Sequence, residues 1–168
     1  HADIEHISKE KGSRKALKDI KIDGAEYHEG KPWQTVAADA YFPCATQNEV
    51  RREDAEVIVK TAKMVVEGAN MPLDAEAQEV MRESDALYAP GKAANAGGVS
   101  VSGIEMAQNA AHYAWTCEEV EDELKRIMNH IHSQCVEHGK TEGGIDYVKG
   151  ANIAGFKRVL NAMKKLGW

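Results

Sequence analysis

Three polar segments of the chain each follow an apolar run and carry side chains suited to binding a cofactor. They are residues 44–49, 67–72 and 90–99, and each combines amide or hydroxyl side chains with small residues. Amide side chains offer both a donor and an acceptor, the pair that a carboxamide needs, and small residues let a flat ring approach the backbone. One such segment is equally consistent with a hydrogen-bonded turn. Three that meet at one place favour a site for a nicotinamide ring.

Other reactive side chains carry weaker signals. Cys44 follows an apolar run and could be a nucleophile, but no base is spaced to activate it, so we expect it to be buried. His130, His132, Cys135 and His138 are close enough in sequence to suggest a metal site. Cys135 belongs to an apolar stripe, however, so we expect a packed cysteine among surface histidines rather than a metal.

The glycine pair Gly97-Gly98 before a helical pattern only faintly suggests a phosphate-binding loop, because the form G-x-G-x-x-G is absent. No such motif opens a helix anywhere in the chain, so the usual pyrophosphate turn is missing. The acidic or basic residue that separates NAD from NADP in that unit is missing too. Lys92 in the third segment could stabilise an anion or brace the segment by donating to carbonyl groups, and we favour bracing.

The elements that must position the polar segments alternate between strands and helices. Short apolar runs that stop at glycine or proline predict buried strands at residues 36–42, 63–67 and 86–89. Amphipathic patterns predict helices between them, at residues 51–62 and 74–84. This alternation indicates a parallel sheet, whose carboxyl edge would gather the three segments. The predicted fold class is α/β: the second half, about three strands, of a Rossmann-type sheet, followed by C-terminal helices.

The remaining segments are predicted to be helices and loops. A polar helix is expected over residues 1–24, ending at Gly24, and a loop is expected at 28–34. A small-residue helix at 107–115 is expected to continue from a loop at Gly97-Gly98. Thr116 and Glu119 form a capping-box pattern that begins a long helix ending at Gly139. A loop at Gly143-Gly144 precedes a last helix at 146–166. We therefore divide the chain into an incomplete dinucleotide-binding domain, residues 1–115, and C-terminal helices, residues 116–168.

Composition excludes several classes of function. The chain has 168 residues and a net charge of −6, which argues against nucleic acid or an anionic membrane as a partner. No apolar run approaches the roughly 20 residues of a membrane span. Three widely spaced cysteines without a C-x-x-C motif argue against a disulfide framework and favour a reducing, cytoplasmic location. Because the chain begins at His1 without a methionine, we expect a fragment, a processed product or a single domain.

Five segments carry a resemblance to a known family, and they occur in order over nearly the whole chain from about residue 30. They are residues 43–49, 66–72, 89–99, 103–109 and 150–156. These segments resemble the hexameric glutamate dehydrogenases. The resemblance implies part of the cofactor-binding domain, followed by C-terminal helices that pack back toward a substrate domain. It also implies NAD or NADP as cofactor, small-molecule partners (glutamate, 2-oxoglutarate and ammonium), and a homohexameric parent enzyme.

The resemblance also implies residue roles. Ala45, Thr46 and Gln47 would line the nicotinamide–ribose part of the cleft, Asn70 would contact that ribose, and Asn95 would bind the carboxamide. In the substrate site, Val99 would pack on the aliphatic part of glutamate and Ser102 would donate to its side-chain carboxylate. Leucine-type relatives carry an apolar residue where Ser102 stands, and a buried polar group left unpaired costs roughly 1–3 kcal/mol. Ser102 therefore favours an acidic substrate, although a role as a helix cap stays open.

The family's catalytic lysine and aspartate lie in its N-terminal substrate domain, so no catalytic residue is expected in this chain. We expect the 168 residues alone to show no turnover. Two alternatives stay open. One is a non-catalytic chain, either a fragment that binds a nucleotide or resists proteolysis or a short protein that binds a nucleotide or a partner. The other is a relative that acts on leucine or phenylalanine.

Overall fold

The computed structural model describes residues 4–13 and 15–168 and divides the chain into two compact units, His1–Val36 and Ala37–Trp168. The first unit contains helix α1 (Ile4–Gly12) and two short 3-10 helices, η1 (Leu17–Asp19) and η2 (Pro32–Gln34). The helix predicted for residues 1–24 is therefore wrong beyond Gly12. No residue of α1 is buried, and a helix without a packed face has little to extend it. Residues 1–3 and 14 of that prediction lie outside the described residues.

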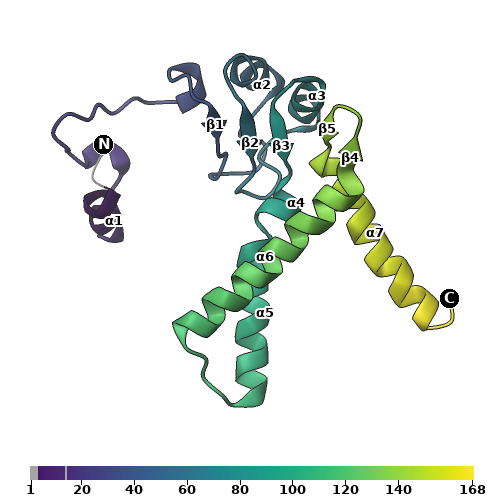
Figure 1. The fold of residues 1–168 in the computed structure, drawn as a ribbon. Helices are drawn as coiled ribbons and strands as arrows, with labels where there is room; N and C mark the ends of the chain where they lie inside the picture. The colour runs from purple at the N-terminus through teal and green to yellow at the C-terminus, as the bar shows by residue number, and fades with distance from the viewer. Residues whose placement is uncertain (1–3, 14) are drawn as a thin grey trace. The chain divides into compact units, whose positions relative to one another are not determined.

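The second unit is built on a three-stranded parallel sheet in the order β1-β2-β3 (Figure 1). The strands are β1 (Ala40–Tyr41), β2 (Met64–Val66) and β3 (Leu87–Ala89). The second and third predicted strands are confirmed, whereas the first is shorter than the predicted 36–42. Val36, the first residue of the predicted strand, lies before β1 begins. Its N–H donates to the Pro32 carbonyl at 2.8 Å and closes the η2 turn.

Helices α2 (Arg52–Ile58) and α3 (Ala75–Glu83) connect the strands and pack against each other. Sequential strand order combined with right-handed crossovers places both helices on one face of the sheet, side by side in Figure 1. Their apolar positions interlock with the strands to form the core of this unit. The most deeply buried apolar members are Val50, Ala55, Ile58, Val65, Leu73, Ala77 and Met81. The periodicity thus predicted both helices, although α2 ends at Ile58 and gives way to turns.

Beyond β3 the chain forms helices α4 (Gly91–Ala94) and α5 (Ala96–Ala111). The loop predicted at Gly97-Gly98 is wrong, because both glycines lie in the first turn of α5. A Cβ on Gly97 would lie 3.6 Å from Leu124 and 3.7 Å from Met128, which is ordinary van der Waals contact, so α6 packs directly against this turn of α5. The helix also ends before the predicted residue 115. It ends at Ala111, and the next residue, His112, adopts a left-handed φ of 52°.

Helix α6 (Cys117–Gly139) packs on α5, and α7 (Tyr147–Lys165) packs on α6 (Figure 1). The predicted capping box is confirmed, since the Glu119 N–H donates to the Thr116 hydroxyl and the Thr116 N–H donates to the Glu119 carboxylate. A hairpin of β4 (Lys140–Thr141) and β5 (Gly144–Ile145) joins the two helices. Over residues 4–13 and 15–168, none of the helices has the combination of length and apolar content that would let it cross a bilayer.

Candidate functional site

The loops after β1 and β2 are joined by backbone hydrogen bonds. The Pro43 carbonyl accepts from the N–H groups of Gly68 and Ala69, at 2.9 and 3.0 Å. Further along, the Asn48 N–H donates to the Met71 carbonyl at 3.0 Å, and both of these residues have positive φ. The first two polar segments therefore form one continuous wall at the carboxyl edge of the sheet.

The wall is tight at Gly68. A Cβ there would overlap the Cys44 sulfur, so a larger residue would require the Cys44 side chain to move. Cys44 itself is exposed, and the expectation that it is buried is wrong. Its sulfur lies against Gly68 on the open side of the sheet edge rather than in the core.

The third segment is held to this wall by the side chain of Asn95. Its Nδ2 donates to the Ala69 carbonyl at 3.2 Å and to Asn70 Oδ1 at 2.8 Å. Within the described part of the chain, Asn95 Oδ1 has no hydrogen-bond partner. With the amide oriented in this way, one strong acceptor stays available at the junction of α4 and α5.

A buried carboxylate, Glu67, fixes the turn that leads to Asn95. Its side chain is only 3% exposed and accepts two hydrogen bonds of 2.6 Å, from the Tyr88 hydroxyl to Oε1 and from the Gly91 N–H to Oε2. Burial raises the pKa of the Tyr88 hydroxyl well above its usual range, and the hydrogen bond to Glu67 and its negative charge add to this. Glu67 is not among the predicted site residues, although a lone carboxylate at the end of an apolar strand is a usable signal.

A groove of about 600 Å³ opens where the three segments meet. The predicted site residues that line it are Ala45, Thr46, Gln47, Asn70, Asn95 and Val99. The remaining lining is formed by Cys44, Gly68, Ala69 and Gly98. The structure thus gathers six of the seven predicted site residues into one groove, whose lining combines small residues with amide and hydroxyl side chains.

Ser102, the seventh predicted residue, does not line the groove. It lies in α5 three residues after Val99, so the two share one face of the helix. Its hydroxyl donates to the Gly98 carbonyl at 3.3 Å, a long bond within the helix that a better acceptor could replace. The alternative role of Ser102 as a helix cap is wrong, because α5 begins at Ala96, a turn and a half earlier.

Lys92 does not line this groove and joins α4 to α7. Its Nζ donates to Asn152 Oδ1 at 2.5 Å. This bond agrees with the bracing role and uses an amide oxygen of α7 as the acceptor. Asn152 is 60 residues away in sequence, so the contact could not be inferred from local spacing.

The three histidines and the cysteine between residues 130 and 138 all lie on α6. Cys135 is buried at 3% exposure, as expected for a packed cysteine, and burial raises the pKa of its thiol. His132 lies 3.0 Å from the Tyr147 hydroxyl and stacks obliquely on that ring. In the described ranges, no three histidine, cysteine or acidic side chains are placed to hold a metal ion together.

Comparison with known proteins identifies the family. The family model described as Glutamate/Leucine/Phenylalanine/Valine dehydrogenase matches residues 2–167. The chain belongs to this family. The resemblance read from the sequence is therefore confirmed, and with it the α/β fold class, since a solved glutamate dehydrogenase superposes with a TM-score of 0.83. That structure is 36% identical, and the match covers 96% of this chain and 37% of the solved one.

Curated members of the dehydrogenase family are about equally similar whichever cofactor they use. The NADP-specific glutamate dehydrogenase of Haemophilus influenzae is 51% identical over 148 residues, covering 86% of this chain and 33% of the relative. The NAD-specific enzyme of Porphyromonas gingivalis is 51% identical over 149 residues, covering 88% and 33%. The chain thus spans about a third of the length of these relatives. Overall identity does not separate the two cofactors.

The groove combines available polar atoms with small residues. Asn95 Oδ1 is an available hydrogen-bond acceptor, and the side chains of Thr46 and Gln47 add further polar atoms to the lining. Gly68 and Ala69 contribute only small side chains to the lining, which leaves the backbone accessible. Ligands of open α/β sheets bind at this edge, outside the carboxyl ends of the strands.

Proposed function

We propose that this chain forms the nicotinamide side of an NAD(P)-dependent glutamate dehydrogenase. The reaction is the reversible oxidative deamination of L-glutamate to 2-oxoglutarate and ammonium. The observation that supports it most directly is the single groove in which Thr46, Asn70 and Asn95 meet. When bound, the cofactor supplies the hydride chemistry, and the protein supplies position and polarity.

In this proposal each groove residue has its own role. Asn95, oriented by its bonds to Ala69 and Asn70, accepts from the carboxamide and so selects one face of the ring. Asn70 lies next to it and contacts the ribose, and Ala45, Thr46 and Gln47 form the opposite wall. Val99 is 72% exposed at the mouth of the groove, where it packs on the aliphatic part of the substrate.

Ser102 determines the substrate class in this proposal. It lies one helical turn beyond Val99, so a substrate on Val99 would place its far end near this hydroxyl. A side-chain carboxylate is a stronger acceptor than the Gly98 carbonyl that the hydroxyl now contacts at 3.3 Å. Leucine offers no acceptor at that end, which favours an acidic amino acid over a branched apolar one.

The wider assignment rests on the resemblance and on these roles. Residues 1–115 belong to the cofactor domain, and residues 116–168 pack toward a substrate domain that carries the catalytic lysine and aspartate. The parent enzyme is a cytoplasmic homohexamer that uses NAD or NADP. Without the catalytic pair, the 168 residues alone produce no NAD(P)H from glutamate, and turnover by the isolated chain would overturn this part.

The cofactor assignment is tested on the chain itself. In saturation-transfer NMR with NADPH and with NADH, we expect the nicotinamide protons to receive the strongest transfer from the protein. Asn95→Ala removes the oriented amide and is expected to weaken binding about tenfold, equivalent to about 1.4 kcal/mol. Asn109→Ala, on exposed α5 surface outside the groove, is the matched control. Equal transfer to nicotinamide and adenine protons, or equal effects of the two variants, would contradict the assignment.

The substrate assignment is tested in the full-length enzyme. Ser102→Val should lower kcat/KM for glutamate by about 10- to 150-fold, because a hydrogen bond to a charged group contributes about 1.5–3 kcal/mol. Leucine turnover should not fall. Ser133→Val is the matched control, since Ser133 makes the same type of intrahelical bond, to the Asn129 carbonyl, far from the groove. An unchanged preference for glutamate over leucine would exclude the role of Ser102.

A further inference from the structure

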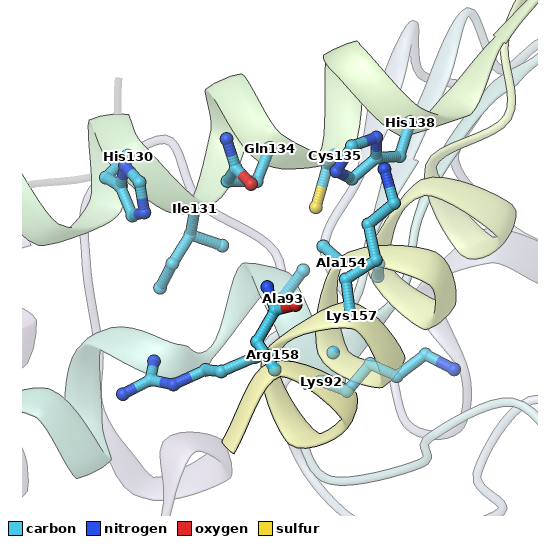
Figure 2. Close-up of a pocket in the computed structure, with 13 residues that line it drawn as sticks. Lys92, Ala93, His130, Ile131, Gln134, Cys135, His138, Ala154, Lys157 and Arg158 are labelled. Atoms are coloured by element: carbon cyan, nitrogen blue, oxygen red, sulfur yellow. The ribbon is translucent and has the colours of Figure 1, made fainter. Parts of the chain in front are cut away.

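A second cleft, of about 830 Å³, lies between α4, α6 and α7 and shares no lining residue with the cofactor groove (Figure 2). Its central part is formed by uncharged side chains, among them Ala93 from α4, Ile131 and Cys135 from α6, and Ala154 from α7. Cys135 is the buried anchor of this part, at 3% exposure. The three helices that form the cleft contact one another directly, since α6 packs on α7 and on α4, and Lys92 of α4 donates to Asn152 of α7.

The charged lining of this cleft is entirely of one sign. The basic and histidine side chains that line it are Lys92, His130, His138, Lys157 and Arg158, and no carboxylate does so. This contrasts with the chain as a whole, whose net charge is −6. In the part of the chain that the structure describes, neither Lys157 nor Arg158 forms an ion pair. Like charges gathered without counter-charges repel one another, and a bound anion would relieve that repulsion.

The two cations of α7 diverge, so the positive charge is concentrated at two ends of the cleft. Figure 2 shows Lys157 extending from α7 toward α6 at the end where His138 lies, whereas Arg158 extends the other way, below Ile131. Lys92, already bonded to Asn152, leaves the centre open. An anion that contacts both Lys157 and Arg158 must therefore be elongated, with a negatively charged group at each of its ends.

We propose that this cleft is a binding site for an elongated phosphorylated anion, with Arg158 and Lys157 as its principal contacts. Guanidinium groups bind phosphate through two parallel N–H donors, and an ammonium supplies a compact point charge, so the pair suits two phosphate groups in a chain. The volume lies within the usual 300–1,000 Å³ of small-molecule sites. The site is separate from the proposed cofactor groove and does not depend on that assignment.

The test is calorimetric titration of the 168-residue chain with inorganic tripolyphosphate, and with sulfate as a compact anion. We expect saturable binding of tripolyphosphate at least tenfold tighter than that of sulfate. Lys157→Gln and Arg158→Gln should each weaken it tenfold or more. Lys164→Gln and Lys165→Gln remove the same charge from exposed positions of the same helix outside the cleft, and they should change it less than threefold.

Two further measurements keep the outcome unambiguous. Far-ultraviolet circular dichroism of each variant confirms that α6 and α7 are intact, and Asn95→Ala, in the cofactor groove, should leave tripolyphosphate binding unchanged. The proposal is overturned if no saturable binding is seen, if sulfate binds as tightly as tripolyphosphate, or if the Lys164 and Lys165 variants weaken binding as much as those in the cleft.

Discussion

Glu67 should contribute more to stability than any exposed acidic residue of the chain, and replacing it gives a graded test of the site's framework. Glu67→Leu removes the acceptor for both the Gly91 N–H and the Tyr88 hydroxyl. Glu67→Gln has the same size but keeps only one acceptor oxygen, so one of the two donors loses its partner. Glu79→Gln, on the exposed face of α3, makes the same chemical change without touching the site.

The size of each effect follows from burial. At 3% exposure Glu67 is inaccessible to water, so water cannot replace the lost acceptor. Each buried donor left unpaired costs about 1–3 kcal/mol, so Glu67→Leu should lower the free energy of unfolding by about 2–6 kcal/mol. Glu67→Gln should lower it by about 1–3 kcal/mol, through the one bond that it cannot remake. Glu79→Gln should stay within about 0.5 kcal/mol of the unmodified chain.

Urea unfolding followed by circular dichroism measures all three variants on one scale. Both variants should bind NADPH more weakly than the unmodified chain, and Glu67→Leu should weaken binding more than Glu67→Gln. The reason is that the turn at Gly91 leads directly to Asn95. The reasoning fails if Glu67→Leu unfolds within about 0.5 kcal/mol of the unmodified chain. It also fails if Glu67→Gln costs as much as Glu67→Leu, since the number of acceptors would then be irrelevant.

Two other changes follow from the same structure. Because the pKa of Tyr88 is raised by burial and by Glu67, the folded chain holds this proton more tightly than the unfolded chain, in which tyrosine titrates near about 10. The stability that this proton contributes is present in full below pH about 10. Above that pH the free energy of unfolding falls by about 1.4 kcal/mol per pH unit. In urea unfolding from pH 9 to 11, the free energy of unfolding should therefore decline less steeply for Tyr88→Phe than for the unmodified chain. Gly150→Ala should lower the free energy of unfolding by about 1–3 kcal/mol, because its Cβ would overlap the Cys135 carbonyl and separate α6 from α7. Gly155→Ala, with open space around its Cβ in the same helix, should instead raise it by about 0.5–1 kcal/mol, and equal thermal shifts for the two alanines would refute the close approach at Gly150.

The strands and helices of the sheet region were predictable because their signals are local. Residues 63–67 and 86–89 are apolar runs closed by glycine or proline, and both became strands. The first strand was overextended because Val36 is β-branched and reads as strand, yet its N–H is taken by the η2 turn. A hydrogen bond to a preceding turn leaves no trace in the apolar pattern.

The segment at residues 90–99 shows how packing overrides local preference. Two consecutive glycines favour a loop, because glycine disfavours helix by about 1 kcal/mol per residue. In the structure Gly97 and Gly98 are helical, and the crossing of α6 close to Gly97 compensates by bringing Leu124 and Met128 against α5. The residues that decide this conformation lie more than 25 positions away in the sequence, beyond any local pattern.

Local sequence specifies the features that neighbouring residues control: the Thr116–Glu119 capping box, the alternation of strand and helix, and the ordered segments that mark the dehydrogenase family. The contacts that build the groove and the cleft instead depend on the folded chain. Glu67 meets Gly91 across 24 residues, Asn95 meets Ala69 across 26, and Lys92 meets Asn152 across 60. A cap closes within one helical turn, so residue spacing alone specifies it. A groove or cleft forms only where distant segments are brought together by burial of the core, and its lining depends on the path of the whole chain.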